Sequence, residues 1–218
     1  MSTRQVFLKD LTVLHAEIVR MGALVEASIG NAVDALERLD PDLARRIASA
    51  DDEIDEMEHA IERRCLEIIA LQQPVARDLR DVASALKLVT DLERIADHAS
   101  DISEKIVVLS SMKRIVLPHP VVTMANLAKQ MVRGALDSYV GRDAVRAADV
   151  ARSDDRVDEL YERIKADLVH LMSVDTENIA ALVELLFICK YFERIADHAT
   201  NVAEWVVFLV DGDHRNLN

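Results

Sequence analysis

Glycine and proline are scarce in this chain, which has five glycines and four prolines among 218 residues. Aromatic residues make up only 4% of the sequence, although half of all residues are hydrophobic. A sequence poor in helix breakers and rich in Ala, Leu, Glu and Arg favours long helices over sheets. The composition therefore predicts an all-α protein with a largely aliphatic core.

Cysteines and long apolar runs are also few. The two cysteines, Cys65 and Cys189, lie in apolar-rich contexts and share no metal-ligand spacing, which is typical of reduced core cysteines. No apolar run approaches the ~18 to 20 residues that a membrane span needs, and no signal peptide precedes Val6. We expect a soluble, cytoplasmic protein without direct membrane insertion.

Positive charge is in deficit, with a formal net charge of −13 and no local run of Lys and Arg. Such a balance repels nucleic acid and anionic lipid, so cationic partners or metal ions are the expected counter-charges. The sequence also has no glycine-rich phosphate loop, no nucleophile elbow and no Cys/His zinc spacing. These absences argue against the enzyme classes that depend on those motifs.

Apolar residues recur at three- and four-residue intervals, and the prolines fall only at the junctions between these periodic segments. Asp40 and Asp143 are placed to cap the second and fifth helices, and either Asp175 or Thr176 to cap the sixth. Gly141 is predicted to end the fourth. The pattern predicts six helices, at about residues 6–39, 41–72, 74–109, 120–140, 143–171 and 175–209.

A seven-residue block is repeated without change one hundred residues later, as 93–99 and 193–199. Extended to Leu109 and Leu209, the two copies agree at 10 of 17 positions. The segments 51–57 and 154–160 are also alike. The chain is therefore an internal duplication of a helix-helix-helix unit. We expect two tandem antiparallel three-helix bundles, with the break near Pro118 and Pro120: residues 1–115 and residues 118–212.

Acids spaced four residues apart lie on the second and third helices of the first half, and such residues share one helix face. In an antiparallel hairpin, residues equally far from the turn lie at the same height. Asp51 and Asp97 centre on Pro74, the predicted turn. Asp55 and Glu93 have the same midpoint. Each acid also follows a core residue by one step of about 100°, which turns both pairs to the same side of the hairpin.

The second half repeats this geometry. Asp154 with Asp197, and Asp158 with Glu193, both centre between residues 175 and 176, again at the predicted turn. Four carboxylates are thus expected to converge in each half. The predicted metal ligands are Asp51, Asp55, Glu93 and Asp97 in the first half, and Asp154, Asp158, Glu193 and Asp197 in the second.

Carboxylates this close repel one another unless a cation neutralises them, and Arg94 and Arg194 point about 100° away. Oxygen ligands suit iron, manganese, magnesium or calcium, and repeated acids also allow a multinuclear cluster. A solvated acidic face is the alternative interpretation. His98 and His198 are candidates for ligation, for hydrogen bonding to a ligating carboxylate, or for packing at the bundle edge. Asp101 and Asn201 extend the stripe as further candidate ligands.

Two segments carry a specific combination of motifs: Leu71-Gln72-Gln73-Pro74-Val75-Ala76-Arg77-Asp78-Leu79-Arg80 and Asp91-Leu92-Glu93-Arg94-Ile95-Ala96-Asp97-His98-Ala99. Together they resemble the PhoU family, the phosphate-specific transport system accessory proteins. The resemblance covers essentially the whole chain. It departs from the pattern at Asn201, which stands where the first half has Asp101, and at the second turn, which lacks the Q-x-P-V-A sequence.

The resemblance implies a pair of three-helix bundles, often dimeric, that negatively regulates phosphate uptake and phosphate-starvation signalling. PhoU-like proteins are thought to link the ATPase subunit of the phosphate ABC transporter to the phosphate-sensing histidine kinase. The family motif E(D)-x-x-x-D, for which iron clusters, zinc or magnesium are implied, matches the eight predicted ligands. On this interpretation the chain is not an enzyme.

Two other interpretations remain open from the sequence. The same carboxylates are compatible with a metalloenzyme, either an oxidase or a phosphohydrolase built on a helical bundle. They are also compatible with a metal-free scaffold whose acidic patch pairs with Arg and Lys on a partner protein. Turnover by the metal-loaded protein would favour the first of these. Metal content that is indifferent to removal of the Glu93 and Asp97 charges would favour the second.

Overall fold

The structure is a computed structural model that describes residues 3–48, 51–112 and 117–212. Every regular element among these residues is helical, as the composition predicts. The first half contains α1 (Thr3–Arg38), α2 (Pro41–Ala48), α3 (Asp51–Gln72) and α4 (Arg77–Ser110). The second contains α5 (His119–Gly141), α6 (Ala144–Ala151), α7 (Asp154–Val174), the short 3-10 helix η1 (Thr176–Asn178) and α8 (Ile179–Asp211).

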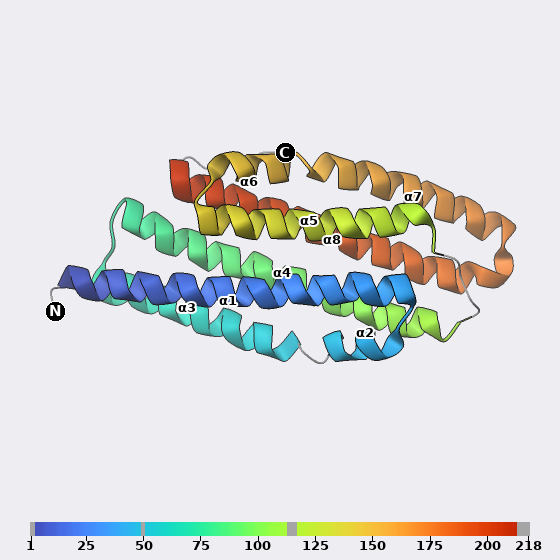
Figure 1. The fold of residues 1–218 in the computed structure, drawn as a ribbon, viewed down its shortest axis with the longest axis horizontal. Helices are drawn as coiled ribbons and strands as arrows, with labels where there is room; N and C mark the ends of the chain where they lie inside the picture. Colours follow the sequence, from blue (N-terminus) through green and yellow to red (C-terminus); the bar gives the residue numbers. More distant parts are fainter. Residues whose placement is uncertain (1–2, 49–50, 113–116, 213–218) are drawn as a thin grey trace.

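Each half is an up-down-up bundle in which the middle rod returns antiparallel to the outer two, as predicted (Figure 1). The halves are not separate bodies. Helices α4 and α8 form the most extensive helix pairing in the molecule, and α1 also contacts α5. The predicted break at Pro118 and Pro120 coincides with the start of α5, and residues 113–116 before it lie outside the described residues.

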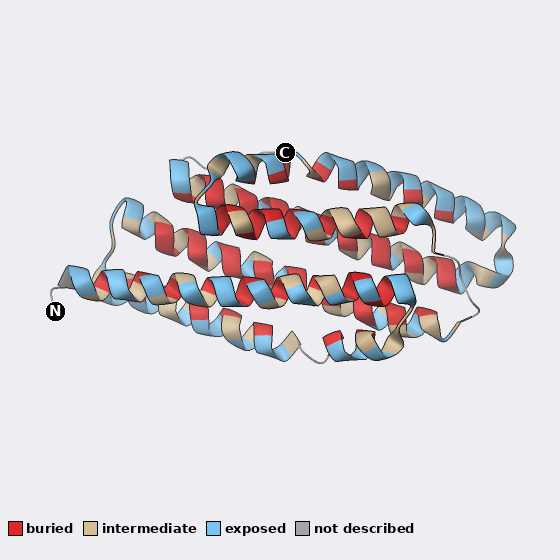
Figure 2. Cartoon of the chain, viewed as in Figure 1, coloured by how far each residue is buried: buried red, intermediate tan, exposed pale blue. Residues whose placement is uncertain are grey.

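The core follows the predicted stripes (Figure 2). Every apolar stripe position predicted on α4 and α8 is buried, from Leu88 to Leu109 and from Phe192 to Leu209. Fully burying one such side chain contributes about 1.5–3 kcal/mol, so these stripes dominate the stability of the bundle. Cys65 and Cys189 are free and buried, as predicted.

The predicted fifth helix is not continuous: it is divided at Arg152 and Ser153 into α6 and α7. Periodicity did not reveal this break because the apolar stripe continues in phase through it. As a result, Asp154 begins a new helix. The predicted second helix is described as α2 and α3, and residues 49 and 50 between them lie outside the described residues.

Helix ends agree only partly with prediction. Asp40 caps α2 by accepting from the backbone N–H groups of residues 42 and 43, each at 3.0 Å. Asp143 likewise caps α6, as predicted. The predicted cap of the sixth helix is wrong, because η1 intervenes and Asn178 is the residue that precedes α8. Gly141 is the last residue of α5, and the left-handed position after it is Arg142, with φ of 49°.

Arg142, whose backbone is left-handed, forms a bidentate ion pair with Asp81. Its guanidinium nitrogens donate to both carboxylate oxygens of Asp81 at 3.2 Å, which ties the end of α5 to α4. Bidentate arginine–carboxylate pairs combine charge with fixed geometry. Among the helices that the structure describes, none has an apolar stretch long enough to cross a bilayer.

Candidate metal centre

Three of the four acids predicted in the first half come together. Carboxylate oxygens of Asp51, Asp55 and Asp97 all lie within 4.8 Å of one another. Asp51 and Asp55 come from the first two turns of α3, and Asp97 comes from the middle of α4. The equal distances from the Pro74 turn therefore placed these residues correctly across the hairpin.

Glu93 lies beside this group but outside the set within 4.8 Å. Burial, followed by the nearby Asp97 carboxylate, raises the pKa of Glu93 to about 7. Burial and the Asp97 and Asp55 carboxylates raise the pKa of Asp51 to about 6. Both shifts mean that the cluster holds its negative charge at a free-energy penalty when no cation is bound.

The arginine of the repeated block contributes more than predicted. Arg94 Nη1 donates to Asp97 Oδ2 at 2.8 Å, and Arg94 Nε lies 3.3 Å from Glu93 Oε2. The long side chain bends across the roughly 100° that separates it from Glu93 and the roughly 60° that separates it from Asp97 around the helix. Its partial exposure leaves the guanidinium in contact with water, so this ion pair is a weak compensation for a partly buried cluster.

One oxygen in the cluster has no protein partner among the described residues. Asp55 Oδ1 is buried and makes no hydrogen bond. A buried, unpaired carboxylate oxygen carries a desolvation penalty unless a donor or a cation meets it. An all-oxygen donor set with one unpaired oxygen fits a hard cation such as magnesium, manganese or iron.

The second half does not reproduce this arrangement. Asp158, Glu193 and Asp197 influence one another electrostatically, but no group of three acids within 4.8 Å occurs among the described residues there. Lys190 Nζ donates to both carboxylate oxygens of Glu193, at 2.6 and 2.5 Å. Asp154 is 4% exposed, at the start of α7. The prediction of two equal four-acid clusters is therefore wrong in its geometry.

Burial raises the pKa of Asp158 and of Asp197, and the Glu193 carboxylate raises both further. The ammonium group of Lys190 opposes the rise in each case. Lys190 therefore acts on three of the four acids predicted for this half. Its spacing of three residues from Glu193 is a sequence signal for an ion pair within one helix turn, which the predicted set of acids leaves out.

The two histidines of the repeated block lie at the seam between α4 and α8. Their ring centroids are 5.7 Å apart. His198 Nδ1 lies 2.9 Å from Asp91 Oδ1, and Asn201 donates to the same oxygen at 3.0 Å. His98 Nδ1 lies 3.3 Å from Asp101 Oδ2. Of their three possible roles, the structure supports packing and hydrogen bonding between the halves, and it gives Asp101 and Asn201 partners other than a metal.

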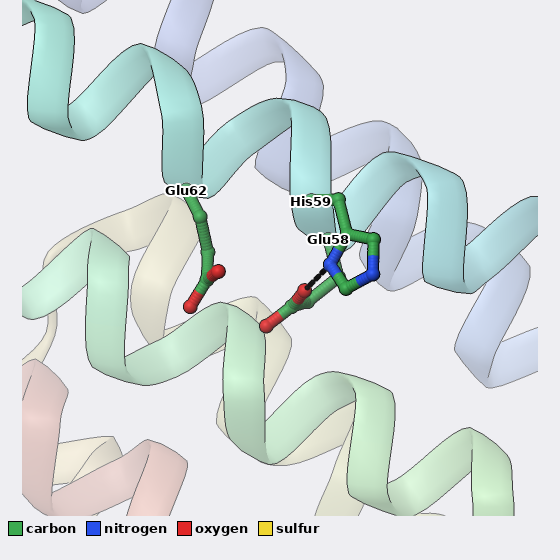
Figure 3. Close-up of side chains that lie close together, drawn as sticks. All are labelled: Glu58, His59 and Glu62. Atoms are coloured by element: carbon green, nitrogen blue, oxygen red, sulfur yellow. Dashed lines mark hydrogen bonds and ion pairs between the residues drawn. The ribbon is translucent and has the colours of Figure 1, made fainter.

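A second group of potential ligands lies further along α3. This group was not among the sites predicted from the sequence. One ligand atom each from Glu58, His59 and Glu62 lies within 4.8 Å of the others. Glu58 is 7% exposed and its Oε2 lies 2.7 Å from His59 Nδ1 (Figure 3). Glu58 also raises the pKa of Glu93, so this group continues the acidic strip of the first cluster.

Comparison with known proteins follows the same division into halves. The sequence model of the PhoU domain matches this chain twice, over residues 18–106 and 121–206. A phosphate-specific transport system accessory protein PhoU homolog from Clostridium acetobutylicum is 42% identical over 217 residues, covering 99% of each chain. A homolog of the same name from Zymomonas mobilis is 40% identical, over 96% of this chain and 89% of its own.

Solved structures agree over nearly the full length. PhoU from Pseudomonas aeruginosa superposes with a TM-score of 0.92 and 36% identity, covering 95% of this chain and all of its own. The phosphate transport system regulatory protein PhoU from Streptococcus pneumoniae gives a TM-score of 0.89 and 28% identity, over 96% and 99%. These names describe accessory and regulatory proteins rather than enzymes, in agreement with the prediction. With both repeats matched and the whole chain covered, this protein belongs to the PhoU family.

Proposed function

We propose that this chain is a regulatory accessory protein of phosphate uptake that binds cations through its carboxylate strip. The regulatory part is supported by relatives that cover the chain almost completely and are named as accessory proteins of phosphate-specific transport. Their architecture is shared over both halves. An accessory role needs binding surfaces rather than a catalytic nucleophile, which suits a helical bundle with an acidic face.

The convergence of Asp51, Asp55 and Asp97 is the observation that carries the cation-binding part. A cation held by these residues would join the first turns of α3 to the middle of α4. It would supply positive charge where two helices now hold like charges together. Iron, manganese and magnesium match the oxygen donors, and zinc is a further candidate.

The proposed partners are the cytosolic ATPase subunit of the phosphate ABC transporter and a phosphate-sensing histidine kinase. On this proposal the protein acts in the cytoplasm as a homodimer and represses both uptake and the starvation response when phosphate is plentiful. The net charge of −13 supports docking to basic surfaces on such partners, because complementary charge steers and orients association.

The role is tested by deleting the gene in its host and measuring phosphate uptake and alkaline phosphatase in phosphate-rich medium. We expect both to rise in the deletion strain and to return to normal with the wild-type gene. A variant carrying Asp51→Asn, Asp55→Asn and Asp97→Asn removes the cluster's charge with little change in shape. Asp52→Asn, an exposed acid on the same helix, is the matched control.

Two outcomes would contradict different parts of the proposal. Unchanged uptake and phosphatase in the deletion strain would contradict the regulatory role itself. Full complementation by the triple variant, equal to that by Asp52→Asn, would instead separate regulation from the carboxylate cluster. Metal analysis of the purified wild-type and triple variant then shows whether the cluster binds a cation at all.

A further inference from the structure

The two halves differ at one position that faces the carboxylates. Lys190 stands on α8 where the repeat places Thr90 on α4, three residues before Glu193 and Glu93 respectively. Lys190 Nζ contacts both oxygens of Glu193. Thr90 instead donates its hydroxyl to the backbone oxygen of residue 86, at 3.3 Å. The lysine ammonium of the second half therefore contacts both oxygens of its glutamate, whereas the glutamate of the first half has one longer contact, with Arg94 Nε at 3.3 Å.

At a second set of positions, too, potential metal ligands of the first half are replaced by other residues in the second half. The strip Glu58, His59 and Glu62 on α3 (Figure 3) is replaced on α7 by residues 161, 162 and 165. The second of these is Glu162, which is ion-paired with Lys165. Potential ligands of the first half thus become an aromatic ring and an ion pair in the second.

Lys165 and Lys190 of the second half both meet at this ring. Lys165 Nζ and Lys190 Nζ each lie 5.3 Å from the ring centroid of Tyr161. Lys190 therefore contacts Glu193 on one side and an aromatic face on the other, so its ammonium group is held by two independent interactions. A bound metal ion in this half would have to displace it from the glutamate or approach against its charge.

We propose that the two carboxylate sites are inequivalent, with the first half binding divalent cations tightly and Lys190 acting as the built-in counter-ion that weakens binding in the second. The inference rests on the proposed cation binding and specifies which half performs it. Lys190 is a specificity-determining residue on this view. The two repeats use the same acids but neutralise them differently: in the first, a metal ion from solution adds to the partial compensation by Arg94, whereas in the second Lys190 supplies a further counter-charge from the chain itself.

A reciprocal exchange of the two residues tests this directly. The full chain is stripped with a chelator and titrated with Mn²⁺ by calorimetry, with bound metal measured independently after gel filtration. We expect tight and weak binding classes in the wild type, the tight class being lost in the Asp51→Asn, Asp55→Asn, Asp97→Asn variant. Lys190→Thr should strengthen the weak class, and Thr90→Lys should weaken the tight class, each by at least about tenfold, since one unit charge is moved within a few ångströms of the ion.

Three further variants separate charge from shape and from general effects. Lys190→Met keeps the length of the side chain without its charge and should behave as Lys190→Thr does. Lys190→Arg keeps the charge and should leave the weak class weak. Lys9→Thr removes an exposed lysine of α1 and should change neither class. Circular dichroism confirms that each variant retains the wild-type helix content.

The outcomes distinguish this inference from the function on which it rests. A wild-type protein that binds no Mn²⁺, and remains without it after Lys190→Thr, would overturn cation binding and the inequivalence together. Tight binding that persists while both Lys190→Thr and Lys190→Met leave the weak class unchanged would overturn the inequivalence alone. Two wild-type sites with equal affinity for Mn²⁺ would also overturn the inequivalence alone.

Discussion

His198 on α8 and Asp91 on α4 are 107 residues apart in sequence, yet Nδ1 of the histidine lies 2.9 Å from Oδ1 of the carboxylate. Their side chains are 16% and 15% exposed, so the contact is largely shielded from water. The repeat-related pair, His98 and Tyr191, stacks its rings at 5.6 Å instead. One duplicated contact is therefore polar in one copy and aromatic in the other, and both join the halves.

Removing the carboxylate of this contact should weaken the association of the halves. We expect Asp91→Ala to lower the free energy of unfolding by about 1–3 kcal/mol, because the half-buried His198 loses its charged partner and Asn201 loses its acceptor. Urea denaturation measures the change. The control is Asp149→Ala, which breaks an exposed pair with Arg152 and should alter stability by less than about 0.5 kcal/mol. Equal effects of the two variants would contradict the assignment.

Two phenylalanines on α8 offer a test of the central core. Phe192 is fully buried, whereas Phe187 is 47% exposed and lies 5.3 Å from Lys105 Nζ. Phe192→Ala should lower the free energy of unfolding by about 3–5 kcal/mol by leaving a cavity. Phe187→Ala should lower it by no more than about 1 kcal/mol. Chemical denaturation of both variants checks the difference, and similar losses would mean that α8 packs by another face.

The side-chain cap of α6 is expected to contribute measurably to the free energy of unfolding. Asp143 Oδ1 accepts from the backbone N–H groups of Val145 and Arg146 at 3.1 and 3.0 Å. Asp143→Ala should lower the free energy of unfolding by about 0.5–2 kcal/mol, since both donors lose their acceptor. Asp143→Asn keeps a side-chain oxygen and should retain most of the stability. A loss with Asn as large as with Ala would show that charge, rather than capping, is what matters.

The stability of the metal-free protein should depend on the carboxylate strip in a defined direction. Asp51 and Glu93 have pKa values raised to about 6 and about 7 from their ordinary 3.8 and 4.5. An acid with a raised pKa in the folded state binds its proton more tightly there than in the unfolded chain. Its contribution to stability is therefore complete below its ordinary pKa and is lost as the pH rises through the raised value.

The window for these two groups runs from about pH 4 to about pH 8. The variant Asp51→Asn, Glu93→Gln mimics the protonated acids at every pH. We expect it to match the metal-free wild type in Tm near pH 4 and to exceed it at pH 8, with Glu67→Gln, an exposed acid on the same helix, as the control. Thermal unfolding in the presence of a chelator measures this. A Tm difference that does not widen with pH would contradict the destabilisation that we assign to the ionised Asp51 and Glu93 carboxylates.

Much of the architecture was accessible from local patterns. Apolar spacing identified the buried stripes of α4 and α8, and the duplicated block identified the two halves. The shared midpoint at Pro74 placed Asp51 and Asp55 opposite Asp97 without any coordinates. These predictions hold because helical periodicity and hairpin register follow from backbone geometry, which a short stretch of sequence specifies.

Two of the failures share a cause in side-chain reach. Arg94 folds back onto Glu93 and Asp97, and Lys190 neutralises Glu193 where a symmetric repeat predicts an open cluster. The break after α6 has a different cause: the apolar stripe stays in phase across Arg152 and Ser153, so periodicity gives no sign that one helix ends and another begins. Projection onto an ideal helix treats side chains as directions, whereas long charged side chains bend toward whichever partner lowers their free energy.

The sequence by itself determined that this protein is helical, duplicated and acidic, and which acids share a helix face. Only the tertiary structure decided how the two copies meet: α4 against α8, with His198 on Asp91 and His98 on Tyr191. The physical reason is the separation in sequence between the residues that interact. Periodicity within one helix depends on neighbours three or four residues away, whereas the seam depends on how two surfaces a hundred residues apart interlock and share their charges.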